Sequence, residues 1–222
     1  MADNFDYIII GSGSAGSALT YRLGESGKHR ILVLEYGGSD AGPFIQMPAA
    51  LSYPMNMKRY DWEYLAEPET SLDGRQLVCP RGKVLGGSST INGMMYMRGN
   101  AADYDSWARS GLTDWSYDHV LPHFRRMEAQ YGRENDKYHS RNGALAVKTA
   151  AGSNPLYSDF LAAGYACGEK VNTDFNGADQ EGLGFYDFNI RNGRRESSSS
   201  AFLRPALERK NLEVFTRTHV SN

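Results

Sequence analysis

The feature that most constrains the fold is a glycine-rich turn close to the N-terminus, set between an apolar run and a segment of helical composition. The run Tyr7–Ile10 has the length and β-branched content of a buried strand, and GSGSAG over residues 11–16 follows it directly. In a GxGxxG turn the glycines permit a tight turn, a close approach of the backbone to a pyrophosphate, and a helix that lies near the sheet. Ser14–Leu23 is the predicted helix, and its N-terminal N–H groups would face the pyrophosphate.

A carboxylate follows at the spacing that dinucleotide-binding folds use. The apolar run Ile31–Leu34 is a second predicted buried strand, and Glu35 comes directly after it, nineteen residues beyond Gly16. A carboxylate at this place accepts hydrogen bonds from ribose hydroxyls and disfavours a 2′-phosphate, which argues against NADP. Strand, turn, helix and acid together predict an adenine dinucleotide site. They leave NAD and FAD open, and glycines alone also mark ordinary loops.

Composition and charge exclude several other classes of protein. The net charge is −2 with scattered basic residues, which argues against nucleic acid as a partner. The two cysteines, Cys79 and Cys167, have neither metal-ligand nor CxxC spacing, so two free thiols are favoured over a disulfide. The N-terminus lacks the pattern of a signal peptide, and no stretch approaches the roughly 18 apolar residues of a spanning helix. We expect a cytoplasmic protein, with peripheral membrane attachment left open.

The segment that follows Glu35 is a candidate functional loop. Residues 36–61 are rich in glycine, proline, methionine and aromatic residues, and they are too many for an ordinary connection. Such a loop needs tethering, by a cofactor or by a partner domain. Aromatic and acidic residues alternate over Tyr60–Tyr64, which predicts a strand with one apolar face. Trp62 within it could line an active site, but a core or edge position is the preferred interpretation.

A second glycine-rich segment follows, with the sequence PRGKVLGGSSTINGMMYMRG over residues 80–99. Gly86 and Gly87 free the backbone to turn its N–H groups toward an acceptor, and Ser88 and Ser89 can cap a helix or bind phosphate oxygens. The segment therefore predicts a second anion or cofactor cradle. The alternative is a Gly-Ser loop followed by a short buried helix rich in methionine.

Residues 82–105 carry a longer and more specific pattern, GK-x-L-GG-SS-x-I-N-x3-Y-x2-G-x5-D. At every constrained position this order resembles the first signature of the glucose-methanol-choline family of FAD-dependent oxidoreductases. The neighbouring text, such as CPRGKVLGGSSTINGMMYMRGNAADYDSWA and NGRRESSSSAFLRPALERKNLEV, is similar to the choline-oxidising branch of that family, and the likeness covers essentially all 222 residues. An NAD-dependent enzyme is disfavoured, because it would leave this second pattern unused.

The resemblance implies an α/β fold: a Rossmann-like FAD-binding domain with a doubly wound parallel sheet, plus part of an antiparallel-sheet substrate domain. The expected domains are residues 1–150 for FAD binding, 151–205 for the start of the substrate domain, and 206–222 for an incomplete return to the FAD-binding domain. The implied cofactor is FAD. Some family members attach the flavin through a histidine just before the asparagine of GGxSxxN, and this chain has Ile91 there, so non-covalent FAD is expected.

The resemblance also implies individual cofactor-binding residues. The pyrophosphate would be held by Gly11, Gly13, Ser14, Ala15 and Gly16, the adenosine ribose by Glu35, the isoalloxazine side by Ser88, Asn92, Gly93 and Met95, and adenine by the backbone of Val220. The base that family members use for catalysis lies in the part of their sequences that follows the region matched by this chain. No catalytic residue and no metal ligand is therefore assigned in this chain.

The remaining segments give a mainly helical pattern followed by short strands. Residues 103–128 are helical in character, with Ser116 or Asp118 as an N-cap. His119 and His123 are four residues apart, as in metal sites on a helix, but Pro122 intervenes and no glutamate lies between them, so surface or packing roles are favoured. His139 stands alone within residues 131–143, a polar segment that predicts an exposed loop.

The C-terminal third predicts alternating short elements. We expect a strand at Leu145–Val147, a helix over 154–168, a strand over 184–191, a helix over 201–210 and a strand over 212–220. Arg194, Arg195 and Glu196 precede four serines. This run fits either a phosphate or modification site or, as preferred, a polar turn whose last serine caps the helix.

The resemblance further implies that the chain is the N-terminal part of a longer enzyme, whose C-terminal half is the expected partner. The implied function is oxidation of a primary alcohol, choline or a choline-like alcohol, by hydride transfer to flavin N5, with this chain supplying most of the FAD site. The alternatives are an alcohol dehydrogenase or oxidase for another aliphatic or aromatic alcohol, a non-redox flavoprotein of the same family, and a non-catalytic FAD-binding half. The electron acceptor and the oligomeric state are left open.

Overall fold

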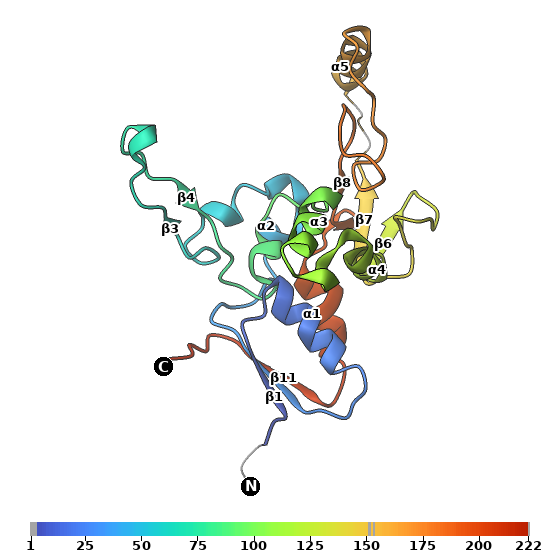
Figure 1. The fold of residues 1–222 in the computed structure, drawn as a ribbon. Coiled ribbons are helices and arrows are strands. Elements are labelled where there is room, and N and C mark those ends of the chain that lie inside the picture. Colours follow the sequence, from blue (N-terminus) through green and yellow to red (C-terminus); the bar gives the residue numbers. More distant parts are fainter. Residues whose placement is uncertain (1–3, 151, 153, 222) are drawn as a thin grey trace. The chain divides into compact units, whose positions relative to one another are not determined.

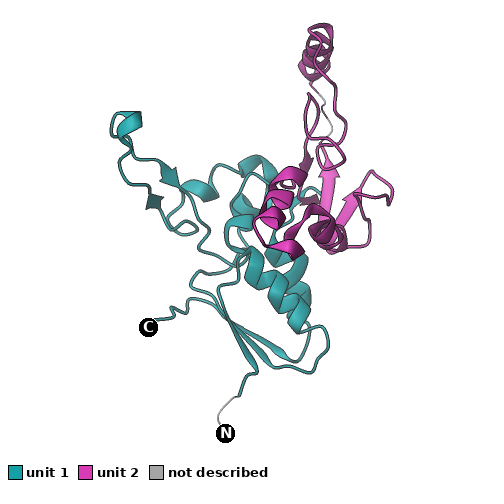
Figure 2. Ribbon diagram, viewed as in Figure 1, with its two compact units in different colours: residues 1–94, 192–222 teal, residues 95–191 magenta. Residues whose placement is uncertain are grey.

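The structure, a computed structural model, describes residues 4–150, 152 and 154–221. The chain divides into two compact units, coloured separately in Figure 2. Unit 1 comprises the residues up to Met94 and those from Asn192 onward, and unit 2 comprises Met95–Arg191. The domain boundaries expected at residues 150 and 205 stay a prediction about the whole enzyme.

A parallel sheet organises unit 1. Its strands are β1 (Tyr7–Ile10), β2 (Ile31–Leu34) and β11 (Leu212–Phe215), in the order β1-β2-β11, with α1 (Ser14–Leu23) against one face (Figure 1). The predicted first helix and the first two strands are confirmed at these bounds. Ile31 and Val33 are fully buried and form a core with Ile9. The order is that of one half of a doubly wound sheet, in which the other half continues beyond β1.

The expectation that β1 is buried is wrong for most of its residues. Ile8 and Ile10 are 59% and 68% exposed, and Tyr7 is 41% exposed, whereas Ile9 is buried. Successive strand residues point to opposite faces, and only the face of Ile9 is covered by α1. Among the described residues β1 pairs with β2 alone, so its outer edge is free.

The long segment after β2 folds into short helical turns and one short antiparallel strand pair. It contains α2 (Pro43–Gln46), the 3-10 helices Pro48–Ala50 and Pro54–Asn56, and the antiparallel pair β3 (Tyr64–Leu65) and β4 (Val78–Cys79), which flank a 3-10 helix at Thr70–Leu72. The strand predicted over Tyr60–Tyr64 is wrong except at Tyr64. Tyr60 and Asp61 are both buried, because Tyr60 joins a core with Ile45 while the Asp61 carboxylate accepts a hydrogen bond from the Arg81 N–H.

The chain returns to unit 1 through β10 (Arg194–Arg195), a π-helical turn at Ser199–Leu203 and α6 (Arg204–Ala206). The helix predicted over 201–210 is therefore displaced and shorter, and it begins with a serine of the run instead of being capped by the last one. The strand predicted over 212–220 ends at Phe215. Arg217 has a φ of 57°, which is incompatible with a strand and turns the chain toward residues 218–220.

Unit 2 contains a mixed sheet and three helices. The elements in chain order are β5 (Met95–Tyr96), α3 (Ala101–Arg109), a 3-10 helix at Thr113–Trp115, α4 (Tyr117–Met127), β6 (Glu128–Tyr131), β7 (Leu145–Thr149), α5 (Pro155–Ala166), β8 (Asp187–Phe188) and β9 (Ile190–Arg191). The sheet order is β5-β8-β7-β6, with β6 parallel to β7 and the other pairs antiparallel.

Several predictions for unit 2 are confirmed at their positions. Ser116 is the N-cap residue of α4, although its side chain bonds His119 Nδ1 at 2.6 Å and caps no backbone N–H. The helix expected over 154–168 is α5, and the Asn154 side chain caps it. The strand expected over 184–191 is reduced to the short β8 and β9. The expected fold class, α/β with a parallel sheet and a separate antiparallel part, is confirmed.

No helix within residues 4–150, 152 and 154–221 combines the length and the apolar character needed to cross a membrane.

Candidate functional site

The first glycine-rich turn connects β1 to α1 in unit 1. Gly11 has a φ of 86°, and a Cβ added to Gly16 would lie 2.0 Å from the Gly11 carbonyl oxygen, so both positions require glycine. The N-cap of α1 is Gly13, and no side chain caps the helix. The N–H groups of the first helical turn therefore have no partner inside the helix, and they carry the positive end of its dipole.

The second glycine-rich segment lies directly against the first. The Gly86 N–H donates to the Ser12 carbonyl oxygen at 3.0 Å, and a Cβ on Gly87 would come within 2.7 Å of the Gly13 Cα. The segment then forms the 3-10 helix Gly87–Thr90. The two turns that the sequence analysis identified separately thus form one surface built largely from backbone.

Glu35 stabilises this surface by hydrogen bonds to the turns that follow β1 and β2. Its Oε2 accepts hydrogen bonds from the N–H and the hydroxyl of Ser12, at 2.8 and 2.7 Å, and its Oε1 accepts one from the Gly37 N–H at 2.7 Å. The side chain is buried at the end of β2. Its expected hydrogen bond to a ribose stays a prediction, but the structure adds a role that the sequence did not indicate: Glu35 links the turns that follow β1 and β2.

A pocket of about 290 Å³ opens where these segments meet. Its lining consists of Ile10, Gly11, Gly13, Leu34, Glu35, Tyr36, Trp62, Gly82, Gly87, Thr218, His219 and Val220. Trp62 stacks on Tyr36 with ring centroids 4.6 Å apart and lies in the pocket wall, not in a core. Val220, beyond the end of β11, lines the same pocket, and its expected contact with adenine stays a prediction.

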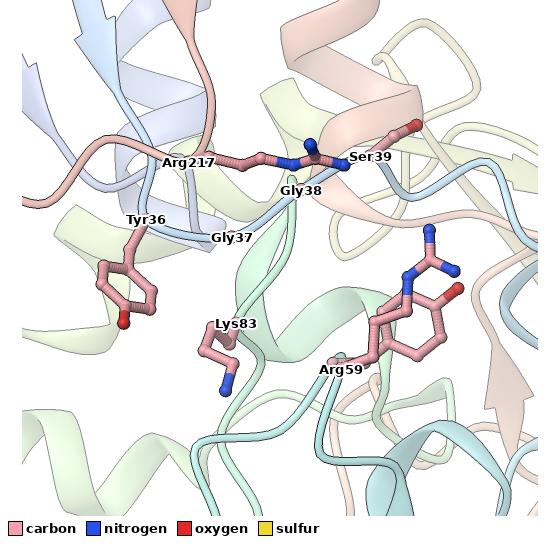
Figure 3. A pocket seen from close by; sticks show the side chains of 8 residues that line it. Tyr36, Gly37, Gly38, Ser39, Arg59, Lys83 and Arg217 are labelled. Carbon is pink, nitrogen blue, oxygen red and sulfur yellow. The ribbon is translucent and has the colours of Figure 1, made fainter.

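A cationic pocket of about 210 Å³ adjoins the first one and shares Tyr36 with it (Figure 3). Arg59, Lys83 and Arg217 come from three separate segments to line it, and the Arg217 side chain extends over Gly38 (Figure 3). Within the described part of the chain, no carboxylate forms an ion pair with these three cations. The positive charge beside the first pocket favours an anionic ligand.

The residues expected beside the isoalloxazine follow in the same loop. The Ser88 hydroxyl accepts a hydrogen bond from the Gly82 N–H at 3.0 Å, and the Asn92 Oδ1 accepts one from the Met94 N–H at 3.0 Å. Gly93 faces open space, since no atom lies within 4 Å of an added Cβ. Met95 is 50% exposed and begins β5 in unit 2. Their roles toward a flavin stay predictions.

Arg195 supports this loop, and sequence reasoning missed it. The side chain is 2% exposed, its Nε donates to the Ile45 carbonyl oxygen at 3.0 Å, and its Nη1 donates to the carbonyl and side-chain oxygens of Asn92 at 2.6 and 3.0 Å. Burial lowers the pKa of Arg195 below its usual range, to about 10. Two arginines before a serine run were interpreted as part of a polar turn, and nothing in the local pattern marks one of them as buried.

The serine run itself is part of the support. Ser198 Oγ and Ser89 Oγ lie 2.9 Å apart, the Ser198 N–H donates to Ser89 Oγ at 2.9 Å, and the Gly86 carbonyl oxygen accepts from both hydroxyls. The run is buried up to Ser199. The preferred interpretation, a polar turn whose last serine caps a helix, is wrong, because Ser199 and Ser200 already belong to the π-helical turn. Within the run, Ser198 is the residue whose hydroxyl bonds the backbone of the second glycine-rich segment.

Unit 2 contains a separate buried polar network. His139 is fully buried, with Nδ1 2.7 Å from Glu128 Oε1 and Nε2 2.9 Å from Asp174 Oδ2. Arg98 donates to the other oxygen of Glu128 and, at 2.7 Å, to the Tyr138 carbonyl oxygen. The expectation of an exposed loop over residues 131–143 is therefore wrong at His139, because two carboxylates, Glu128 and Asp174, hold its two ring nitrogens inside unit 2.

The charge state of His139 follows from its partners. Burial alone lowers the pKa of this imidazole, but hydrogen bonds with Asp174 and Glu128 outweigh burial and raise the pKa from 6.5 to about 9. A carboxylate faces each ring nitrogen, so both nitrogens carry hydrogen and the ring is an imidazolium. Two cations then balance two carboxylates inside unit 2, which suits a structural role.

The other candidate residues have ordinary local partners. His123 Nδ1 lies 3.0 Å from an Arg126 nitrogen, and His119 bonds Ser116, so each histidine of the pair interacts within its own helix. Cys79 and Cys167 are free thiols, as expected. Within the described ranges, no group of three or more His, Cys, Asp or Glu side chains has the arrangement of a metal site.

Comparison with known proteins gives consistent relatives. Oxygen-dependent choline dehydrogenases of Brucella suis and Rhizobium etli are each 53% identical to this chain over 209 and 207 residues, which is 94% and 93% of the chain. The chain spans 38% of the length of these relatives. Among solved structures, pyridoxine 4-oxidase from Mesorbium loti has a TM-score of 0.90 at 35% identity, over 96% of this chain and 42% of that protein.

A second solved relative, an FAD-dependent oxidoreductase from Chaetomium thermophilum, has a TM-score of 0.87 at 26% identity, over 96% of this chain and 38% of that protein. Residues 5–222 match the family model described as GMC oxidoreductase, so the glucose-methanol-choline resemblance found in the sequence is confirmed. The chain belongs to the GMC oxidoreductase family.

Proposed function

We propose that this chain provides the FAD-binding part of an enzyme that oxidises a primary alcohol. The observation that carries the proposal is the contact between the two glycine-rich turns, with Gly87 against Gly13 and the unpaired N–H groups of α1 beside them. Such a surface accepts a pyrophosphate closely, because neither a side chain nor a capping group stands in the way. The pocket of about 290 Å³ at this surface, with Trp62 and Val220 in its lining, suits the adenosine end of the cofactor.

The cofactor is proposed to be FAD held without a covalent bond. Glu35, in the pocket wall, favours an unphosphorylated ribose, which fits FAD and disfavours a 2′-phosphate. Ile91 precedes Asn92, and an isoleucine side chain offers no nucleophile for flavin attachment. The proposed contacts are those expected from the sequence, from the first turn through Ser88, Asn92, Gly93 and Met95 to Val220.

Choline, or an alcohol like it, is the proposed substrate. Two relatives that are 53% identical carry the name choline dehydrogenase, whereas the solved relative named for pyridoxine oxidation is 35% identical. Bound FAD supplies a hydride acceptor for alcohol oxidation. This chain's own part is to hold and orient the cofactor and to exclude water from it, and the base that takes the hydroxyl proton is proposed to lie in polypeptide beyond residue 222.

The partner is proposed to be the C-terminal half of the same enzyme. The outer edge of β1 is free among the described residues, and Ile8 and Ile10 expose apolar side chains on the uncovered face. A doubly wound sheet continues from this strand, so a further parallel strand would pair with β1 and elements above it would cover both isoleucines. Placement in the cytoplasm, with or without peripheral membrane contact, stays a prediction.

An anaerobic absorption spectrum, recorded before and after choline is added to the full-length enzyme, tests this function. We expect the spectrum of an oxidised flavin that bleaches when choline is added. A flavin spectrum that choline leaves unchanged but another primary alcohol bleaches would overturn the substrate proposal alone. A flavin that no alcohol reduces would favour a non-redox member of the family, and a protein without flavin would contradict the proposed cofactor site.

A further inference from the structure

The Asn92 side chain has a defined orientation in unit 1. Its Oδ1 lies 3.0 Å from the Met94 backbone nitrogen and 3.0 Å from Arg195 Nη1. Both neighbours are donors without acceptor capacity, so only the amide oxygen can face them. The NH2 group of Asn92 therefore points the other way, and within the described ranges it donates to no protein atom, because the residue is exposed.

Arg195 is the residue that enforces this orientation. Its guanidinium also bonds the Asn92 carbonyl oxygen at 2.6 Å and the Ser89 carbonyl oxygen at 3.4 Å, while Nε holds the Ile45 carbonyl oxygen. The planar guanidinium of Arg195, called the fork below, thus joins the end of α2 to both ends of the segment 89–92. Lysine could not reproduce these contacts. Its ammonium is a single point charge, whereas the separate nitrogens of the guanidinium reach both the Ile45 and the Asn92 carbonyl oxygens.

The guanidinium is buried and all its hydrogen-bond acceptors are neutral oxygens. Nη2 is also buried and has no hydrogen-bond partner among the described residues. Retaining a cation under these conditions costs free energy, which is reflected in the lowered pKa of Arg195. The hydrogen bonds of Arg195 go mostly to the segment 89–92, so its main effect is to fix the conformation of Asn92 and of this loop.

We propose that Arg195 is a positioning residue for the cofactor: it turns the Asn92 amide so that its NH2 group, and not its oxygen, is presented to an acceptor atom of the flavin. This inference rests on the proposed function, since it takes the segment 88–95 to lie beside the isoalloxazine. It assigns Asn92 the role of donor and Arg195 the role of fixing that donor. Neither role followed from the sequence.

The test compares four variants of the full-length enzyme. Arg195→Met removes the fork and keeps an apolar stem, and Arg195→Lys keeps the charge without the fork. Asn92→Asp keeps an oxygen for Arg195 but removes the NH2 donor. Arg194→Met is the matched control, because Arg194 is the exposed neighbour of Arg195.

Two readouts are measured on each variant. The first is hydrogen exchange of the peptide that covers residues 86–94, with the flavin removed. The second is the dissociation constant for added FAD, together with the midpoint reduction potential of the bound flavin. Exchange reports the loop without any cofactor, while affinity and potential report what the loop presents to the cofactor.

Loss of the fork is expected to speed exchange of this peptide about tenfold or more in Arg195→Met and in Arg195→Lys. FAD affinity should fall about tenfold to a hundredfold in both variants. In Asn92→Asp exchange should stay slow, since Arg195 keeps its partner, while FAD affinity falls and the midpoint potential drops because a carboxylate replaces a donor. Arg194→Met should match the wild-type enzyme in every readout.

Two results would overturn the proposal. One is wild-type exchange and FAD affinity in Arg195→Lys, and the other is wild-type FAD affinity and potential in Asn92→Asp. If Arg195→Met does not fold, Arg195→Lys and Asn92→Asp still decide the outcome. If the wild-type enzyme itself bound no FAD, the proposed function would fail, and the exchange measurements would separately establish whether Arg195 holds the loop.

Discussion

The two glycine-rich turns of unit 1, which are the proposed cofactor cradle (residues 11–16 and 86–90), contrast with the buried ion network of unit 2. The cradle is built mainly from backbone, with Gly87 against Gly13 and Ser12 joined to Glu35, and it leaves N–H groups open. The network is built from side chains that satisfy one another, with His139 and Glu128 fully buried. A site that must receive a ligand keeps donors unpaired, whereas a structural network pairs its charges.

The largest expected effect breaks the cradle. In Gly87→Val the added side chain begins 2.7 Å from the Gly13 Cα, and the positive φ of Gly87 is strained for any other residue. The atoms that the new side chain meets are backbone atoms of Gly13, which cannot move aside alone, so the two turns must separate. We therefore expect FAD affinity to fall more than a hundredfold, about 3 kcal/mol or more. The flavin content per protein, measured by absorbance, checks this.

Gly38→Ala is the matched control for that substitution. An added Cβ at Gly38 meets only the Arg217 Nε, at 3.9 Å, which is ordinary contact. The flavin content of this variant should equal that of the wild-type enzyme. Equal flavin content in Gly87→Val would show that the contact between the two turns is not needed for binding.

The next largest effect breaks the network instead. Arg98→Met leaves the Glu128 carboxylate buried without its arginine, and removal of one partner from a buried pair costs about 3–5 kcal/mol of folding stability. Urea denaturation followed by fluorescence measures this. The control is Arg141→Met, which disrupts the exposed pair with Glu134 and should cost less than about 1 kcal/mol. Equal costs for the two variants would contradict the structural role of the network.

The protonation of His139 sharpens the comparison, because it makes the network sensitive to pH. The pKa of His139 is about 9 in the folded protein and 6.5 ordinarily, so protonated His139 stabilises the fold below pH 6.5, and this contribution is lost as the pH rises through 9. The shift corresponds to about 3 kcal/mol. Urea denaturation across this window should show the loss, and His139→Gln should abolish it. An unchanged pH dependence in His139→Gln would assign the loss to other groups.

The smallest expected effect concerns the hydrogen bonds between Ser12 and Glu35. Ser12→Ala removes the hydroxyl that donates to Glu35 but keeps the backbone N–H that bonds the same oxygen. We expect a loss of about 1 kcal/mol in FAD binding, roughly fivefold in the dissociation constant. Ser26→Ala, at an exposed serine, is the control and should bind FAD normally. A Ser12→Ala variant with unaltered affinity would indicate that the backbone bond alone holds Glu35.

The same contrast explains what the sequence could predict. The strand, turn and helix of the cradle were predicted at their bounds, because a backbone-built turn needs glycines at fixed and closely spaced positions. Glu35 was predicted from its place directly after the next strand, and its expected contact with a ribose stays a prediction. The second turn was recognised from Gly86 and Gly87, and the structure then brought it against the first.

The residues that sequence reasoning missed are those whose partners are distant along the chain. Arg98, Glu128, His139 and Asp174 meet only in the folded unit, and each looks like an ordinary polar residue within its own segment. Arg195 was missed for the same reason, because its acceptors belong to α2 and to the loop of Asn92. The exposure of β1 was missed because a strand that is apolar on both faces predicts burial on both faces. The described residues cover only the face of Ile9.

The most direct test of the central claim is acid precipitation of the purified full-length enzyme, followed by an absorption spectrum of supernatant and pellet. The claim is that the two glycine-rich turns hold FAD without a covalent bond, with Ile91 offering no point of attachment. We predict that all the yellow colour is found in the supernatant, as one FAD per protein chain. Colour that stays in the pellet would contradict non-covalent binding, and a colourless protein would contradict the cradle itself.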